Sequence, residues 1–148
     1  MTRIPFVLLA LLALTLAACS GGDSHAVETV EIVVEAGDFS FSPAVIEVQT
    51  GQAVRLTLNN AEQLEHDWSI DRIHVSHVRE HSAHSAAHGD DMHGRDPDLH
   101  VAAMAGQSGV VEFTPTEPGE YKIVCNVAGH EEAGMVGTLI VTGEGSAH

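Results

Sequence analysis

Three side chains that bind soft metal ions lie within eleven residues of the sequence, between Cys125 and Met135. This loop reads C-N-V-A-G-H-E-E-A-G-M, and it supplies a thiolate, the imidazole of His130 and a thioether. Thiolate and thioether ligands select copper, and imidazole binds it as well. Two histidines, one cysteine and a weak axial methionine are typical of a copper electron-transfer site. The loop therefore offers three of the four ligands of such a site.

The fourth ligand must come from elsewhere in the chain, and His66 is the candidate. It opens the segment H-D-W-S-I, where a polar turn after Asn59 and Asn60 gives way to apolar sequence. If this segment and the one ending at Cys125 are strands that meet at one end of the fold, His66 reaches the loop. Ordinary alternatives remain: His66 would be satisfied by a backbone hydrogen bond, and Met135 would fill a gap in the core.

Short β-strands separated by turns are expected to position these ligands. Residues 30–35 alternate apolar and acidic side chains, which is the period of a strand with one wet face. Later runs rich in Val, Ile, Thr and Phe lie between Gly, Pro and Asn turn signals, at 45–48, 54–58, 68–70, 110–114, 121–125 and 137–142. They predict an all-β fold, an antiparallel Greek-key β-sandwich. A partly open barrel is the competing architecture.

The first residues of the chain predict an export signal. Arg3 precedes a nearly unbroken apolar run over residues 4–16, and small residues then lead to Cys19. This pattern is typical of a secretory signal peptide, and it is too short for a transmembrane helix. It resembles a bacterial lipoprotein signal, in which Cys19 is lipidated and Cys125 is left for metal binding. Ordinary secretion is one alternative, and a disulfide between Cys19 and Cys125 is another.

These features divide the chain into one domain and its flanking segments. We expect a signal peptide over 1–18, a tether over 19–26, a copper-binding domain over 27–142 and a tail over 143–148. The protein is then a monomer on the periplasmic or cell-surface side, held to a membrane by its lipid anchor.

The charge of the chain bears on its partners. There are 21 Asp and Glu residues against 6 Lys and Arg, which gives a formal net charge of −15. Such an acidic protein is not expected to bind nucleic acid. Its charge favours solubility, and it would steer the protein toward a basic docking face on a redox partner.

Two segments of the chain resemble cupredoxins, the blue (type 1) copper family. They are N-N-A-E-Q-L-E-H-D-W and T-P-T-E-P-G-E-Y-K-I-V-C-N-V-A-G-H-E-E-A-G-M-V-G-T-L-I-V, and the loop spacing is similar to that of auracyanin, rusticyanin and plastocyanin-like proteins. The resemblance covers about residues 27–142. It implies one type 1 copper ion with His66, Cys125 and His130 as equatorial ligands and Met135 as the long axial ligand. It also implies one-electron carriage, with the exposed edge of His130 as the electron exit.

Two places depart from the family pattern. Asp67 stands where many members have Asn, and because an ionised carboxylate only accepts hydrogen bonds, the contacts that orient the ligand loops are expected to differ. Glu131 and Glu132 follow His130, where a redox carrier often has an apolar patch. Their negative charge is expected to favour Cu(II) and to lower the redox potential.

Residues 71–100 form a histidine-rich insert that the resemblance does not account for. Its first five histidines are three or four residues apart, so a helix from Asp71 to Gly89 would place them on one face. Histidine-rich tracts bind metals such as copper, zinc or nickel, although a mobile, pH-sensitive loop is the alternative. The candidate secondary ligands are His74, His77, His81, His84, His88 and His93, and His100 ends the insert.

Three functional classes can be compared with these residues. The four-ligand set favours a lipid-tethered electron carrier, whereas the insert favours a copper chaperone, buffer or resistance protein. A copper enzyme such as a nitrite reductase would need a second catalytic copper and usually a second domain. A paired-copper centre would need a second loop cysteine where Gly129 stands. We therefore expect a protein that is not an enzyme.

Overall fold

The protein folds as a β-sandwich, which a computed structural model describes for residues 28–81 and 97–143. Its strands are β1 (Val30–Gly37), β2 (Ser40–Ser42), β3 (Val45–Gln49), β4 (Val54–Asn60), β5 (His66–Ile70), β6 (Val75–His81), β7 (Leu99–Ala103), β8 (Ser108–Pro115), β9 (Gly119–Val124) and β10 (Val136–Thr142). The expected signal peptide and tether, with Cys19, and the insert histidines His84, His88 and His93 lie outside the described residues.

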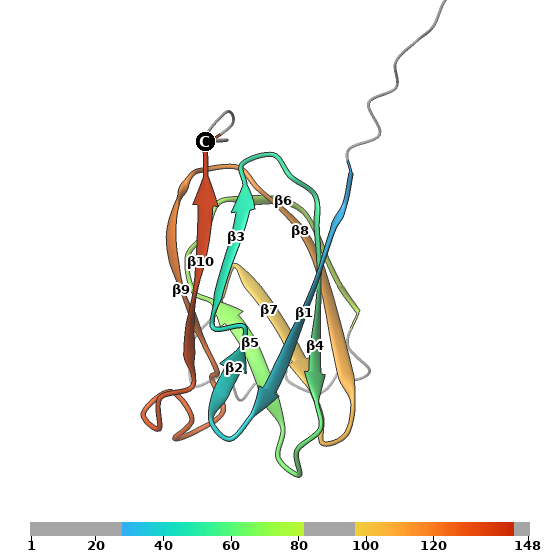
Figure 1. Cartoon of the computed structure of the whole chain (residues 1–148), viewed down its shortest axis with the longest axis vertical. Helices are drawn as coiled ribbons and strands as arrows, with labels where there is room; N and C mark the ends of the chain where they lie inside the picture. The colour runs from blue at the N-terminus through green and yellow to red at the C-terminus, as the bar shows by residue number, and fades with distance from the viewer. Residues whose placement is uncertain (1–27, 82–96, 144–148) are drawn as a thin grey trace, which may run out of the picture.

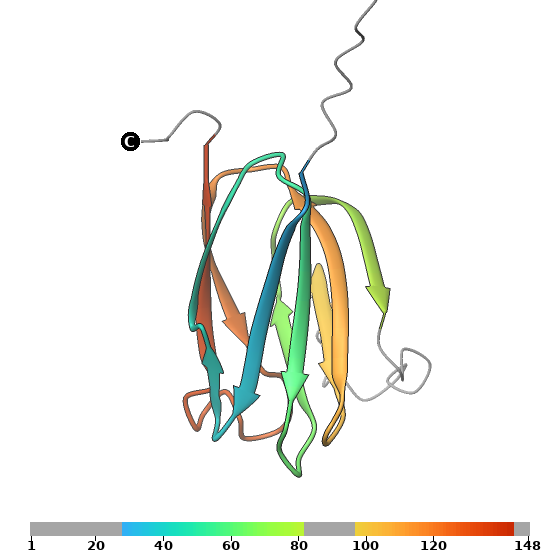
Figure 2. The ribbon, with the colours of Figure 1, turned by 45° about the vertical axis from the view of Figure 1, so that its right-hand side comes forward.

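The strands form two five-stranded sheets that face each other (Figure 1, Figure 2). Their orders are β2-β1-β4-β8-β6 and β3-β10-β9-β5-β7. Most neighbours are antiparallel, and the predicted all-β sandwich is confirmed. Two pairs, β1 with β4 and β3 with β10, are parallel, so both sheets are mixed. The second pair arises because the chain changes sheets between β2 and β3 and then meets the last strand.

The core lies between the sheets and follows the two-residue period of the strands. In β4, β8 and β10 buried positions alternate with more exposed ones, because successive side chains point to opposite faces. Trp68 of β5 stacks on Phe113 of β8 across the core, with ring centroids 6.3 Å apart. β5 is buried at every position, including His66 at its start.

The described start of the histidine-rich insert is a strand, so the helix predicted from Asp71 is wrong over this stretch. β6 pairs antiparallel with β8 at the edge of the first sheet, and its register shifts between Ser76 and Arg79. Spacings of three and four residues are compatible with a helix, but here the backbone hydrogen bonds go to β8. Ile73 is buried in the core just before β6, which ties this end of the insert to the sandwich.

Several connections gather at the end of the sandwich opposite the last residues of β10 (Figure 1). They are the β1–β2 turn, the β4–β5 loop, the β7–β8 turn and the β9–β10 loop. The β9–β10 loop holds Cys125, His130 and Met135, and the β4–β5 loop leads into His66. Chain segments that are distant in sequence thus meet at one end.

The described part of the chain contains no helix with the length and hydropathy to cross a membrane.

Candidate metal centre

Three of the four predicted ligands meet at this end of the sandwich. One donor atom from each of His66, Cys125 and His130 lies within 4.8 Å of the others, and all three residues are buried. Cys125 Sγ is 3.4 Å from His130 Nδ1. Cys125 follows directly after β9, which neighbours β5 in the second sheet, so adjacent strands deliver the thiol and the His66 imidazole to one place.

The loop from 125 to 135 is closed by its own backbone. The Cys125 N–H donates to Met135 O at 3.2 Å, and the Met135 N–H donates to His130 O at 2.9 Å. Gly129 and Gly134 have φ angles of 84° and 103°, a region that residues with a Cβ rarely adopt. This closure returns Met135 to the base of the loop, where its side chain is completely buried.

His66 offers an observation that tests whether a metal ion fits. Its Nδ1 is buried and has no hydrogen-bond partner among the described residues. Buried polar atoms are nearly always satisfied, so a bare imidazole nitrogen here needs an explanation. A copper ion among two imidazoles and a thiolate supplies it, because this donor set suits copper. In the alternative interpretation, a backbone hydrogen bond would satisfy His66. The described residues supply no such bond to Nδ1.

Burial disfavours the charged forms of Cys125 and His66 in the metal-free protein. It raises the pKa of the Cys125 thiol to about 12, and the negative charge of Asp67 adds to the rise. Burial also lowers the pKa of His66, as does the nearby His130, against the opposing charges of Glu62 and Asp67. A metal ion binds the thiolate, so its binding must release the thiol proton.

Asp67 makes two contacts with the start of the ligand loop. Its backbone N–H lies 3.5 Å from Cys125 Sγ, and its Oδ1 accepts a hydrogen bond from the Asn126 N–H at 2.6 Å. In the second contact Oδ1 is an acceptor, a role that the amide oxygen of an Asn could also take. Asp67 is itself buried, so this pair of contacts fixes the thiol and the start of the loop relative to β5.

Phe39 covers His130, which the sequence did not lead us to expect. His130 is only 5% exposed, and the Phe39 ring meets it edge-on with centroids 5.0 Å apart. The expected exposed edge of His130 is therefore covered, while Phe39 itself is 43% exposed. Phe39 and Asp38 have φ angles of 56° and 45°, rare for such residues. An apolar residue after the Gly37-Asp38 turn signal was the available clue.

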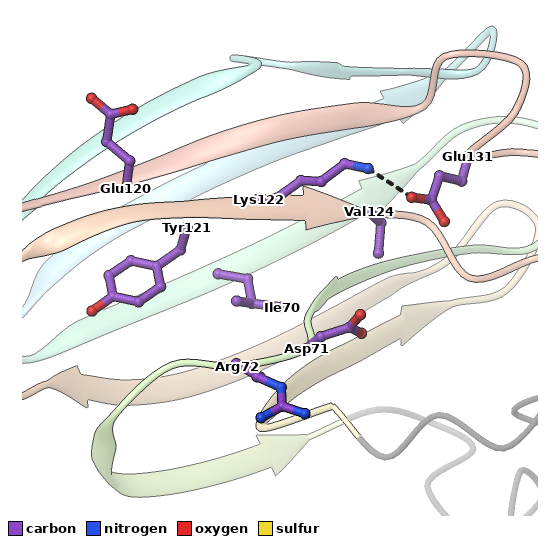
Figure 3. Close-up of a pocket in the computed structure, with 8 residues that line it drawn as sticks. All are labelled: Ile70, Asp71, Arg72, Glu120, Tyr121, Lys122, Val124 and Glu131. Carbon is purple, nitrogen blue, oxygen red and sulfur yellow. Dashed lines mark hydrogen bonds and ion pairs between the residues drawn. The ribbon is translucent and has the colours of Figure 1, made fainter.

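Lys122 partly balances the negative charge expected beside His130. Its Nζ lies 2.7 Å from Glu131 Oε1, and the pair spans from β9 to the ligand loop. Figure 3 shows this contact at the rim of a cavity of about 370 Å³, with Tyr121 and Arg72 farther along its wall. Because Lys122 places a positive charge beside Glu131, we expect the effect of Glu131 on a bound copper ion to be smaller than its charge alone would give.

The insert histidines that the structure describes do not join the cluster. His74 is exposed and pairs with Glu117 at 3.1 Å, and His77 contacts the Ser76 hydroxyl at 3.1 Å. His81 is exposed at the end of β6. Within residues 28–81 and 97–143, the group formed with His66 is the one set of three or more potential ligands that come this close. No secondary metal site is assembled in these parts of the chain.

Comparisons with known proteins agree with this site. Residues 28–142 match the family described as copper binding proteins, plastocyanin/azurin family. The chain is 32% identical over 120 residues to the copper-resistant cuproprotein CopI of Rubrivivax gelatinosus, a match that spans 81% of this chain and 70% of that protein. It is 31% identical over 144 residues to CopI of Pseudomonas aeruginosa, with 80% and 78% covered.

Auracyanins form a second group of similar proteins. Auracyanin-B of Chloroflexus aurantiacus is 32% identical over 143 residues, which cover 86% of this chain and 60% of that protein. The solved structure of auracyanin B superimposes with a TM-score of 0.57 at 27% identity, over 77% of this chain and 88% of that one.

Proposed function

Because the chain belongs to the plastocyanin/azurin family of copper-binding proteins, we propose that its type 1 copper ion carries single electrons between redox partners outside the cytoplasm. The observation that carries this proposal is the closed arrangement of His66, Cys125 and His130, whose donor atoms are buried within 4.8 Å of one another. A donor set organised in advance favours electron transfer, because little must move when the metal changes its charge.

Each residue of the site has a role in this proposal. Bound copper supplies a one-electron couple between Cu(I) and Cu(II). Cys125, His66 and His130 would hold it as the strong ligands, and Met135 would be the fourth, weaker ligand. Their burial excludes water, and Asp67 keeps the thiolate in place through its two contacts with residues 125 and 126. Phe39 is the exposed ring next to His130, so electrons would leave the protein at this end.

Copper resistance is a second candidate function, and a specific observation favours it. Two similar proteins that share 31% and 32% identity with this chain are named copper-resistant cuproproteins. The histidine-rich insert would suit a protein that captures or buffers copper. The two functions differ in exchange, since a carrier retains its copper through many redox cycles whereas a buffer surrenders it to a moderate competitor.

Export and anchoring belong to the same proposal. The apolar run and small residues before Cys19 support secretion and lipidation at this cysteine. Lipid on Cys19 would place the copper domain on the outer side of a membrane, near a partner with a basic face. Replacement of Cys19 by Ser should release the protein from the membrane fraction, and retention in that fraction would contradict the anchor.

The first experiment is a copper titration of residues 23–148 followed by visible spectroscopy. We expect an intense blue thiolate-to-copper band that is absent in Cys125→Ser, and a copper ion that stays bound through repeated reduction and oxidation against a chelator. Copper bound without the band would contradict the type 1 site. A blue protein that loses its copper to the chelator during cycling would favour the resistance function over electron carriage.

A further inference from the structure

His100 lies between two carboxylates that belong to different sheets. It stands on β7 opposite Ser69 of β5, and its side chain is 15% exposed. Its Nε2 is 3.6 Å from Asp67 Oδ2, and its Nδ1 is 3.7 Å from Glu80 Oε1 on β6. Neither the resemblance to cupredoxins nor the ligand cluster assigns a role to this histidine.

The contact with Asp67 leads directly to the copper ligands. The other oxygen of this carboxylate accepts the Asn126 N–H at 2.6 Å, and the Asp67 N–H faces Cys125 Sγ at 3.5 Å. A continuous series of polar contacts therefore runs from β6 through His100 and Asp67 to the first residues of the ligand loop.

We propose that His100 is a positioning residue of the copper site, which orients the Asp67 carboxylate so that it holds the ligand loop at Asn126. This inference deepens the proposed function, and it rests on copper binding at this end of the sandwich. The Asp67 side chain is 8% exposed, and a buried charge is unfavourable unless it is paired or hydrogen-bonded. The Asn126 amide engages one oxygen, and His100 is the partner of the other.

The charge of His100 strengthens this contact. Burial alone would lower the pKa of His100, but contact with Asp67 and the negative charges of Asp67, Glu80 and Glu65 raise it overall. When the imidazole is protonated, its charge balances that of the Asp67 carboxylate, whose backbone N–H faces Cys125. As the pH rises through the pKa of His100, that balance is lost, and the uncompensated charge of Asp67 should favour Cu(II) and lower the potential.

The test begins with the metal-free protein, so it does not depend on electron transfer. In ¹⁵N-labelled protein we expect the Asn126 amide shift to titrate with the same midpoint as the His100 ring. In His100→Gln this titration should vanish, and exchange of the Asn126 amide should be about three- to tenfold faster. His74→Gln is the matched control, because it removes an exposed histidine that also pairs with a carboxylate.

Asp67→Asn separates positioning from a general role in stability. Its amide oxygen can still accept from Asn126, but it carries no charge for His100 to balance, so the Asn126 titration should disappear while the fold persists. If the Asn126 amide shift of the wild-type protein does not titrate with the His100 midpoint, the proposal is overturned. This reading of the wild type remains valid even if His100→Gln does not fold.

The copper-loaded protein gives a second readout. The potential of the wild type should fall as the pH passes the His100 midpoint, and that fall should be absent in His100→Gln. A potential with the same pH dependence in both proteins would overturn the proposal. If the protein fails to form a blue site at all, the proposed function fails, while the amide titration still decides the role of His100.

Discussion

Two regions are rich in side chains that bind metal: the ligand loop, residues 125–135, and the histidine-rich insert, residues 71–100. Their metal-binding side chains differ in burial and in contacts. In the loop, Cys125 and His130 are buried. They lie close to His66, which begins the neighbouring strand β5. In the described part of the insert, His74 and His77 are exposed and contact polar groups at the surface. Strand contacts between distant segments thus organise a site, whereas the number of ligands alone does not.

The difference has an energetic meaning. A side chain loses conformational entropy when a metal ion fixes it, and buried loop ligands have lost most of this freedom during folding. Exposed histidines of the insert would lose it on binding. Copper should therefore bind the loop tightly and leave it slowly, and any metal on the insert should exchange readily.

Removal of copper should have the largest effect on stability. A ligand that binds only the folded state adds about 4 kcal/mol at a free concentration about one thousand times its Kd. Thermal unfolding of the copper-loaded and metal-free proteins should show this gain as a higher Tm. A triple variant with His74, His77 and His81 replaced by Gln should show the same rise in Tm with copper. Loss of that rise would mean that the insert, and not the ligand loop, holds the stabilising copper ion.

Two single histidine replacements compare the regions directly. His66→Gln should weaken copper binding by more than about a hundredfold, because it removes a ligand from the organised cluster. His77→Gln should leave the affinity within about twofold, since this exposed side chain lies outside the cluster. Competition titrations against a chelator measure both values. Equal losses in the two variants would place the principal metal site elsewhere.

Backbone strain in the loop provides a third test. Gly134 has a φ of 103°, and no heavy atom lies within 4 Å of the position that an alanine methyl group would take, so Gly134→Ala should cost about 1–3 kcal/mol through strain alone. Gly106 in the β7–β8 turn has a φ of 70° and equally open surroundings, and Gly106→Ala should cost about 1 kcal/mol. Urea unfolding gives both values. Only Gly134→Ala should also speed copper release.

The charges beside His130 should have a modest effect. Glu131→Gln with Glu132→Gln should raise the copper potential because less negative charge then favours Cu(II). Since Lys122 already pairs with Glu131, we expect a rise below about 59 mV, which corresponds to a tenfold change for one electron. A redox titration at low ionic strength measures it. No change in potential would show that these charges are fully balanced or screened.

The pH dependence of stability should be the smallest effect. The pKa of His100 is raised in the folded protein, so the stabilisation from its charge is fully present below its unfolded pKa of 6.5. It is lost as the pH rises through the higher folded pKa. The difference in unfolding free energy between wild type and His100→Gln should therefore shrink with rising pH in this range. A constant difference would mean that His100 contributes packing only.

Much of the fold and of the site follows from local sequence patterns. Alternation along residues such as Val30 to Glu35 and turn signals between runs were enough to predict the sandwich. The loop spacing suggested Cys125, His130 and Met135 as one group, and the structure gathers the first two with His66. These features were predictable because strand periodicity and ligand chemistry are both visible over a few residues.

Other features depend on contacts between distant segments. The strand at β6 was missed because pairing with β8 decides its conformation, while its histidine spacing fits a helix equally well. Phe39 reaches His130 from a turn about ninety residues earlier. The contact between His100 and Asp67 likewise requires knowledge that β7 lies beside β5. Such neighbours cannot be recognised until the order of strands is known.

The edge position of β6 bears on how the protein behaves in crowded surroundings. An open sheet edge exposes backbone groups that invite strand addition by another chain, and charged side chains and bulges prevent such addition. β6 carries Arg79 and Glu80, and its register shift after Ser76 interrupts the regular ladder. The opposite edge, β2, is only three residues long. Both edges of this sheet therefore disfavour the addition of a strand from another chain.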